Sequence, residues 1–127
     1  PTLRWMLYLH LDCVAADPHL LTDIDRKPAA QIMFFNGTSQ PPEVPIEYLP
    51  NPHLENILAF SFQLKLCAEA YFPGFTRKIY LKGLRYNLHL RGRSALIEVG
   101  AQNNTYEEAR NAMEPLSELL DMVLRGE

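Results

Sequence analysis

The sequence predicts an α/β fold in which a mostly parallel sheet is flanked by helices. The short apolar run at residues 95–99 is typical of a strand buried on both faces, as in a parallel sheet. Residues 5–12 alternate apolar and polar side chains, which predicts a second strand. Segments with helical spacing give the order strand, strand, helix, extended segment, strand, helix. With 127 residues, 47% of them hydrophobic, we expect residues 1–127 to form a single domain.

The two strands expected first in the chain differ in their patterns. At residues 5–11 the odd positions are apolar, so that His10 and Asp12 share the opposite face. Residues 30–35 form a continuous apolar-rich run that predicts the next strand. This strand should end at Gly37, because glycine readily adopts the positive φ of a turn.

The remaining non-helical segments are polar or rich in proline. Residues 16–28 are polar and turn-prone, and we expect them to be irregular. Five prolines within residues 38–52 also predict an irregular loop. Residues 78–81 predict a short exposed extended segment, and residues 83–92 predict a loop.

The first predicted helix begins at Asn51, as N-cap, with Pro52 at the first helical position. Its apolar side chains recur at helical spacing as far as about Tyr71, and Pro73-Gly74 should end it.

The second predicted helix has a clear start. Thr105 and Glu108 have the spacing of a capping box, and apolar residues follow at i+3 and i+4 as far as Val123. Pro115 lies within this pattern, and we expect it to kink the helix.

Composition and charge exclude some classes of function. A net charge of −3 and a pI near 5.8 give no overall basic surface for nucleic acid. No apolar stretch approaches the roughly 20 residues that span a bilayer, and no signal peptide opens the chain. Because the first residue is Pro1, we expect a fragment whose targeting segment lies upstream. Basic residues cluster within residues 77–93, as in a solvated loop or a site for an anionic ligand.

Glu98 is a single carboxylate inside the apolar run. Burying an ionised carboxylate costs several kcal/mol unless a metal, a cation or a proton pairs with it. One interpretation is a structural ion pair with Arg91 or Arg93. Another involves His10, since both residues lie near the carboxyl ends of predicted strands, where sites of open α/β sheets gather. If the two strands are parallel neighbours, imidazole and carboxylate meet and provide the minimum of a zinc-hydrolase centre.

Several segments resemble the SpoIIP family of zinc-dependent peptidoglycan hydrolases, which act in engulfment during endospore formation. The Y-L-H-L-D-C segment around His10 resembles the family's "D-L-H-R-D-A" strand. The Tyr-Asn loop, the I-E-V-G strand and the N-T-Y-E-E-A helix start resemble the family together, a specific combination. Across roughly residues 7–124, the further similar stretches occur in the same order, at residues 30–35, 51–56 with 72–77, and 85–90 with 96–100 and 103–109.

The resemblance implies a zinc-amidase-like core and a set of site residues. In that core two histidines and a glutamate hold the metal, and a further glutamate is the catalytic base. The first histidine and the glutamate ligand belong to an upstream segment, so the chain would be the C-terminal portion of an N-acetylmuramoyl-L-alanine amidase-like catalytic domain. On matching positions the resemblance implies zinc coordination by His10, catalysis by Glu98, support of His10 by Asp12, and substrate binding by Arg85, Tyr86 and Asn87.

The implied reaction is cleavage of the amide between N-acetylmuramic acid and L-alanine of the stem peptide, with zinc as cofactor. The implied partners are peptidoglycan and other sporulation membrane proteins, with no nucleic acid. The implied location is extracytoplasmic, with a membrane anchor in the upstream segment. Because two ligands would lie upstream, we expect weak metal binding and little catalysis from the present residues alone.

Departures from the family pattern keep alternatives open. Tyr8 stands where the family has aspartate, Leu11 where it has arginine, and Leu88 where it has glutamine. One alternative is a catalytically inactive domain of the same fold that binds peptidoglycan or a partner protein. Another is an unrelated α/β enzyme. This alternative would be favoured if Glu98 were paired with Arg91 or Arg93 and far from His10. A loop held by its own side-chain hydrogen bonds is the alternative for residues 85–87.

Overall fold

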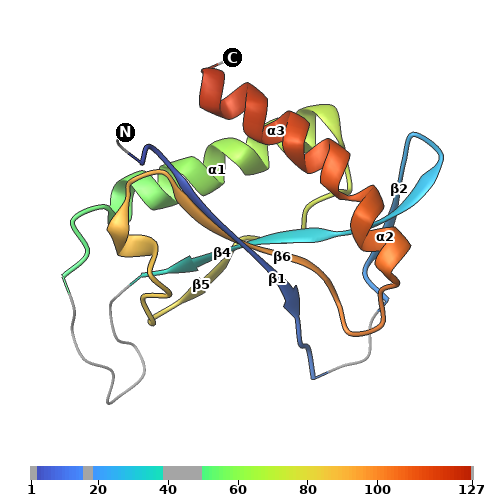
Figure 1. Ribbon diagram of the computed structural model, residues 1–127, viewed down its shortest axis with the longest axis horizontal. Coiled ribbons are helices and arrows are strands. Elements are labelled where there is room, and N and C mark those ends of the chain that lie inside the picture. Colours follow the sequence, from blue (N-terminus) through green and yellow to red (C-terminus); the bar gives the residue numbers. More distant parts are fainter. Residues whose placement is uncertain (1–2, 16–18, 39–49, 127) are drawn as a thin grey trace.

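The computed structural model describes residues 3–15, 19–38 and 50–126, which fold around a four-stranded sheet of order β1-β6-β4-β5 (Figure 1). Strand β1 (Met6–Asp12) pairs in parallel with β6 (Ser94–Ala101). Strand β4 (Ile32–Gly37) is antiparallel to β6 and parallel to β5 (Tyr80–Lys82). The predicted α/β class with a mostly parallel sheet is therefore confirmed, with one antiparallel pairing at its centre.

Two long helices pack on one side of this sheet (Figure 1). They are α1 (Leu54–Tyr71) and α3 (Met113–Arg125). Alternate residues of β6 point toward them, because successive side chains of a strand face opposite ways. The main core contains Ala95, Ile97 and Val99 of β6, Phe60, Leu64 and Ala68 of α1, and Leu116 and Leu119 of α3.

The other side of the sheet has a smaller apolar cluster. Leu96 of β6 packs there with Ile57 and Leu88, and Tyr8 and Phe35 lie against them. Leu88 begins the short 3₁₀ helix η1 (Leu88–Leu90). Strand β6 is buried at all eight positions, as the apolar run predicts. Glu98 alternates with the helix-facing residues, so its side chain lies on this second side.

One element of the fold was not predicted. Within the stretch expected to be irregular, β2 (Leu21–Ile24) and β3 (Lys27–Ala30) form an antiparallel hairpin. Its two turn residues, Asp25 and Arg26, have φ of 50° and 64°. This is the type I′ geometry that suits two-residue hairpins, but Asp-Arg lacks the glycine that usually announces it. The predicted proline-rich loop falls largely outside the described residues.

The first helix begins later than predicted. The N-cap position is His53, and the Asn51 side chain accepts a hydrogen bond from the His53 backbone N–H at 3.1 Å. Asn51 and Pro52 therefore lie in a turn before the helix rather than in its first positions, because the asparagine side chain closes a local turn of its own. The expected extended segment is also shifted slightly, to strand β5.

The C-terminal helical region is divided into two helices. The predicted capping box is confirmed at the start of α2 (Tyr106–Asn111), where Thr105 and Glu108 each accept a hydrogen bond from the other's backbone N–H. The chain then breaks at Ala112, and Pro115 lies in the first turn of α3. A proline is tolerated there but clashes with a carbonyl four residues earlier in a continuous helix, so the expected kink is instead a break. No helix within the described ranges is long and apolar enough to cross a membrane.

Candidate functional site

His10 and Glu98 are brought together by the pairing of β1 with β6. The two residues are opposite each other in the parallel register. Opposite residues of paired strands project from the same face of a sheet, so imidazole and carboxylate are neighbours. Met33 is the partner of Glu98 on the other flank, in β4. The two strands are therefore parallel neighbours, which is the arrangement that a shared site of His10 and Glu98 requires.

The Glu98 carboxyl group is buried without a full set of partners. The residue is 9% exposed, and its Oε2 atom is buried without a hydrogen-bond partner among the described residues. Burial raises the pKa of Glu98, and the nearby Asp12 carboxylate raises it further, whereas His10 and Arg77 act in the opposite direction. The net effect is a raised pKa. A carboxyl group tuned in this way can accept and return a proton nearer to neutral pH.

The alternative of a structural ion pair between Glu98 and a nearby arginine is wrong. Arg91 donates hydrogen bonds from its guanidinium to the backbone carbonyls of Leu3 and Leu90, at 3.1 and 2.9 Å. Arg93 precedes β6 and lines a pocket beside α1. The charge of Glu98 is therefore not neutralised by either residue.

Asp12 is paired with an arginine from a distant segment of the chain. Its Oδ2 atom accepts a hydrogen bond from Nη1 of Arg77 at 2.8 Å, and both side chains are largely buried. The backbone of Arg77 is fixed in turn by its N–H, which donates to the Ile32 carbonyl at 2.8 Å. Arg77 thus joins the charged cluster of His10 and Glu98, although its sequence position alone gave it no role. Its place in one of the stretches similar to the family was the available signal.

A β-bulge follows the two central residues. The register shifts because His10 faces Glu98 while Asp12 faces Ala101, so β6 has one extra residue there. Gly100 has φ of 65°, and a Cβ atom on it would lie 2.6 Å from Oδ1 of Asn104. Only glycine fits this position without displacing its neighbour. The positive φ and the close approach of Asn104 therefore explain why glycine occupies this position of β6.

The loop with the three expected substrate-binding residues covers the same side of the sheet. Tyr86 packs edge-on against the Phe35 ring, with centroids 4.8 Å apart. Phe35 is paired with Leu96, one row of side chains away from Glu98. Tyr86 and Asn87 have positive φ, of 51° and 60°.

Arg85 has a structural contact of its own. Its Nη2 atom donates to the Pro50 carbonyl at 3.0 Å, while its Nε atom is buried without a hydrogen-bond partner within the described part of the chain. The hydrogen bond from Nη2 to Pro50 agrees with the alternative in which side-chain hydrogen bonds hold the loop. Because the Nε atom is buried, a ligand could reach this guanidinium only at its other nitrogens.

A partly buried interaction ties the segment before the hairpin to α2. The His19 Nε2 atom lies 2.9 and 2.8 Å from the two carboxylate oxygens of Glu108. The hydrogen bond from His19 is the main cause of the lowered pKa of Glu108. Asn104 connects the same group to the backbone, donating to Glu108 and to the Leu20 carbonyl. This cluster fixes the segment that follows the bulge.

The residues present fit part of a zinc site. His10 offers an imidazole nitrogen as a ligand, and beside it Glu98 has a buried carboxylate oxygen, without a hydrogen-bond partner among the described residues, that can accept a proton. Across the described ranges, no group of three or more histidine, cysteine, aspartate or glutamate side chains could hold a metal ion. A catalytic zinc site normally has three protein ligands, so further ligands would have to come from outside these residues.

Comparison with known proteins gives one match. A family model described as "Stage II sporulation protein P (SpoIIP)" matches residues 1–121. No curated protein and no solved structure matches the chain. The matched range contains both strands of the candidate site, the loop at residues 85–87 and most of the C-terminal helix.

Proposed function

The chain belongs to the SpoIIP family of stage II sporulation proteins, and on this basis we propose that it is the C-terminal part of a zinc-dependent peptidoglycan amidase. The proposed reaction cleaves the amide between N-acetylmuramic acid and L-alanine of the stem peptide during engulfment. The proposed enzyme acts outside the cytoplasm, held by an upstream membrane anchor, with peptidoglycan as substrate and sporulation membrane proteins as partners.

One observation carries this proposal: a buried carboxyl group with a raised pKa lies next to a histidine on parallel strands. Glu98 is suited to take a proton from the attacking water, because its charged form is poorly solvated and its Oε2 atom has no hydrogen-bond partner in the described part of the chain. In the second half of the reaction, the same group would return this proton to the departing amine nitrogen. The backbone of a buried strand keeps the carboxyl group in place throughout.

His10 would supply one nitrogen ligand to zinc, and the remaining ligands would come from the upstream segment. When bound, zinc would polarise the amide carbonyl and lower the pKa of a water molecule. The Asp12–Arg77 ion pair lies beside these groups. Asp12 raises the pKa of Glu98, whereas Arg77 lowers it. Tyr86 and Asn87, on the same side of the sheet, would contact the glycan-peptide, and Arg85 would attract its acidic groups.

The test compares three forms of the full-length zinc-loaded protein on purified peptidoglycan. Glu98→Gln keeps the shape of the side chain but removes the base, so release of stem peptides should fall by about 100-fold or more. Zinc content should not change, because the proposed role of Glu98 is proton transfer and not metal binding. Glu118→Gln is the matched control, since Glu118 is an exposed carboxylate on α3, and it should retain wild-type activity.

A second variant tests the metal. His10→Ala should lower both zinc content and activity, whereas the Glu98 variant lowers activity alone. Equal activity of the wild type and the Glu98 variant would refute the catalytic role. Tight binding of peptidoglycan without cleavage by the wild type would instead favour the alternative of a domain retained for recognition.

A further inference from the structure

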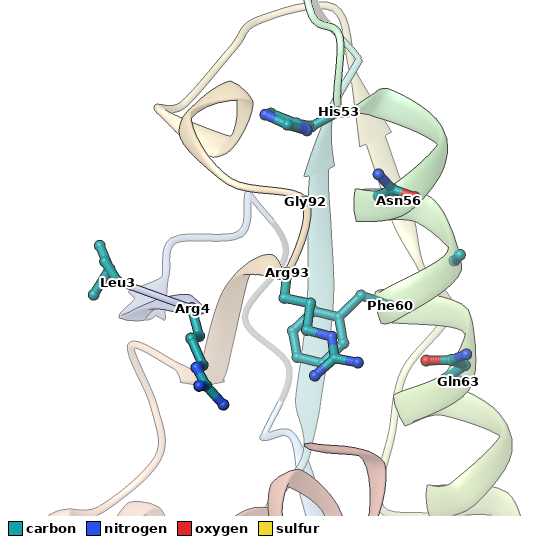
Figure 2. A pocket seen from close by; sticks show the side chains of 9 residues that line it. Leu3, Arg4, His53, Asn56, Phe60, Gln63, Gly92 and Arg93 are labelled. Atoms are coloured by element: carbon teal, nitrogen blue, oxygen red, sulfur yellow. The ribbon is translucent and has the colours of Figure 1, made fainter. Parts of the chain in front are cut away.

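Figure 2 shows the pocket beside α1 to which Arg93 contributes. Its volume is about 570 Å³, within the range typical of small-molecule sites. The register of β1 with β6 begins at Met6 and Ser94, and His10 and Glu98 follow four residues later. Four residues of strand correspond to about 13 Å. The pocket, lined by Leu3, Arg4, His53, Asn56, Ala59, Phe60, Gln63, Gly92 and Arg93, is therefore separate from the candidate active site.

The polar side chains that the described residues contribute to this pocket are all cationic or neutral. Arg4 and Arg93 contribute guanidinium groups and His53 an imidazole, and none of the described aspartates and glutamates lines the pocket. Within the described part of the chain, neither guanidinium has a hydrogen-bond or ion-pair partner. Asn56 and Gln63 add side-chain amides from α1, on the wall that faces the arginines (Figure 2). In a chain with net charge −3 this is a local concentration of positive charge.

Two hydrogen bonds connect the chain segments that carry the two arginines. Arg91 donates to the Leu3 carbonyl at 3.1 Å, and the Met6 N–H donates to the Arg93 carbonyl at 2.9 Å. These bonds connect the segment that contains Arg4 to the one that contains Arg93. Two guanidinium groups that face one pocket repel each other, and an anion bound between them would relieve this repulsion. The connected segments thus bring two positive charges to a place where an anion can bind.

The opposite wall is equally constrained. A Cβ atom on Gly92 would lie 3.1 Å from the Asn56 side chain, so the loop before β6 rests directly on α1. Phe60, 3% exposed, belongs to the core and forms an apolar wall together with Leu3 and Ala59. The pocket thus combines donors from several directions with a small apolar surface.

We propose that this pocket binds a phosphate group. A carboxylate is planar and is satisfied by a single bidentate arginine, whereas a phosphate presents oxygens in several directions and suits two guanidinium groups with additional amide and imidazole donors. The apolar wall would contact the organic part of a phosphate ester. The source is either a phosphate compound in solution or the headgroup of a lipid. This inference is independent of the proposed hydrolase activity.

The experiment follows amide and arginine Nε signals of the protein by NMR while inorganic phosphate replaces chloride at constant ionic strength. Saturable shifts are expected at Gly92, Asn56 and Arg93. A parallel arm uses vesicles with and without phosphatidylglycerol and measures co-sedimentation. Binding to inorganic phosphate identifies the source in solution, and binding to anionic vesicles alone identifies the lipid source.

Charge variants show whether the pocket is responsible. Arg4→Gln and Arg93→Gln should each weaken binding about tenfold or more, because each removes a charge-assisted hydrogen bond. Arg110→Gln removes the same charge from α2, outside this pocket, and should change affinity less than about twofold. The NMR spectrum of each variant without ligand verifies its fold. The proposal is wrong if neither probe binds saturably, or if Arg4→Gln and Arg93→Gln bind as tightly as the wild type.

Discussion

Replacing Glu98 by glutamine should stabilise the protein at neutral pH. The wild-type carboxylate is 9% exposed and its Oε2 atom lacks a hydrogen-bond partner among the described residues, so its charge is poorly compensated. A buried polar group without a partner costs about 1–3 kcal/mol, and more when charged. Glutamine removes the charge but leaves an amide that is also incompletely bonded. We therefore expect a gain of about 1–2 kcal/mol in the free energy of unfolding at pH 7.

The pH dependence of this gain has a definite sign. The pKa of Glu98 is raised above its ordinary value of 4.5, so folding favours the protonated form. The contribution of the protonated Glu98 to the free energy of unfolding is fully present below pH 4.5 and is lost as the pH rises through the folded-state pKa. The difference between the variant and the wild type should accordingly be small at acidic pH, grow above about pH 4.5 and then reach a plateau.

Thermal and urea unfolding across this pH range measure the effect. For 127 residues, 1 kcal/mol corresponds to about 4 °C in Tm. Glu118→Gln again serves as the exposed control and should change stability by less than about 0.5 kcal/mol. A Glu98→Gln variant that is less stable than the wild type at pH 7 would refute the reasoning, because it would mean that the carboxylate has a compensating partner.

Three further perturbations test other contacts. Asp12→Asn should destabilise the protein by about 1 kcal/mol through loss of a partly buried ion pair. It should also lower the pKa of Glu98, which carboxyl ¹³C NMR measures. An unchanged pKa would contradict the repulsion between Asp12 and Glu98. Glu108→Gln should lower Tm at pH 7, and His19→Gln should lower it less. The difference in Tm between wild type and Glu108→Gln should shrink as acid protonates Glu108 below its depressed pKa. A pH-independent difference would argue against the ion pair. Gly100→Ala should cost about 2 kcal/mol or more by urea unfolding, because of its positive φ and the clash described above; a neutral effect would show that the bulge can relax.

The sequence predicted the parts of this structure that depend on local patterns. The buried β6, the alternating β1 and the capping box of α2 all follow from residue spacing. The hairpin at residues 21–30 was missed because Asp25 and Arg26 adopt positive φ without the usual glycine. The hairpin is bonded to α2, where Asn111 donates to the Pro28 carbonyl, and no local sequence window contains this contact.

The candidate site shows the same limit. The sequence predicted that His10 and Glu98 would lie side by side only if their strands were parallel neighbours. No sequence pattern predicted that β4 would pair antiparallel on the other flank of β6. The pairing of Asp12 with Arg77 joins residues 65 positions apart. Spacing contains no information about such contacts, so only the folded structure could place this arginine in the site.

The complete burial of β6 has a consequence for motion. Amide groups in a central strand, bonded on both edges, open mainly through global unfolding, so those of β6 should be among the slowest to exchange hydrogen for deuterium. Glu98 is thus fixed before any substrate arrives. In the proposed enzyme, adjustment to a glycan-peptide would then have to come from the elements around β6 and not from this strand.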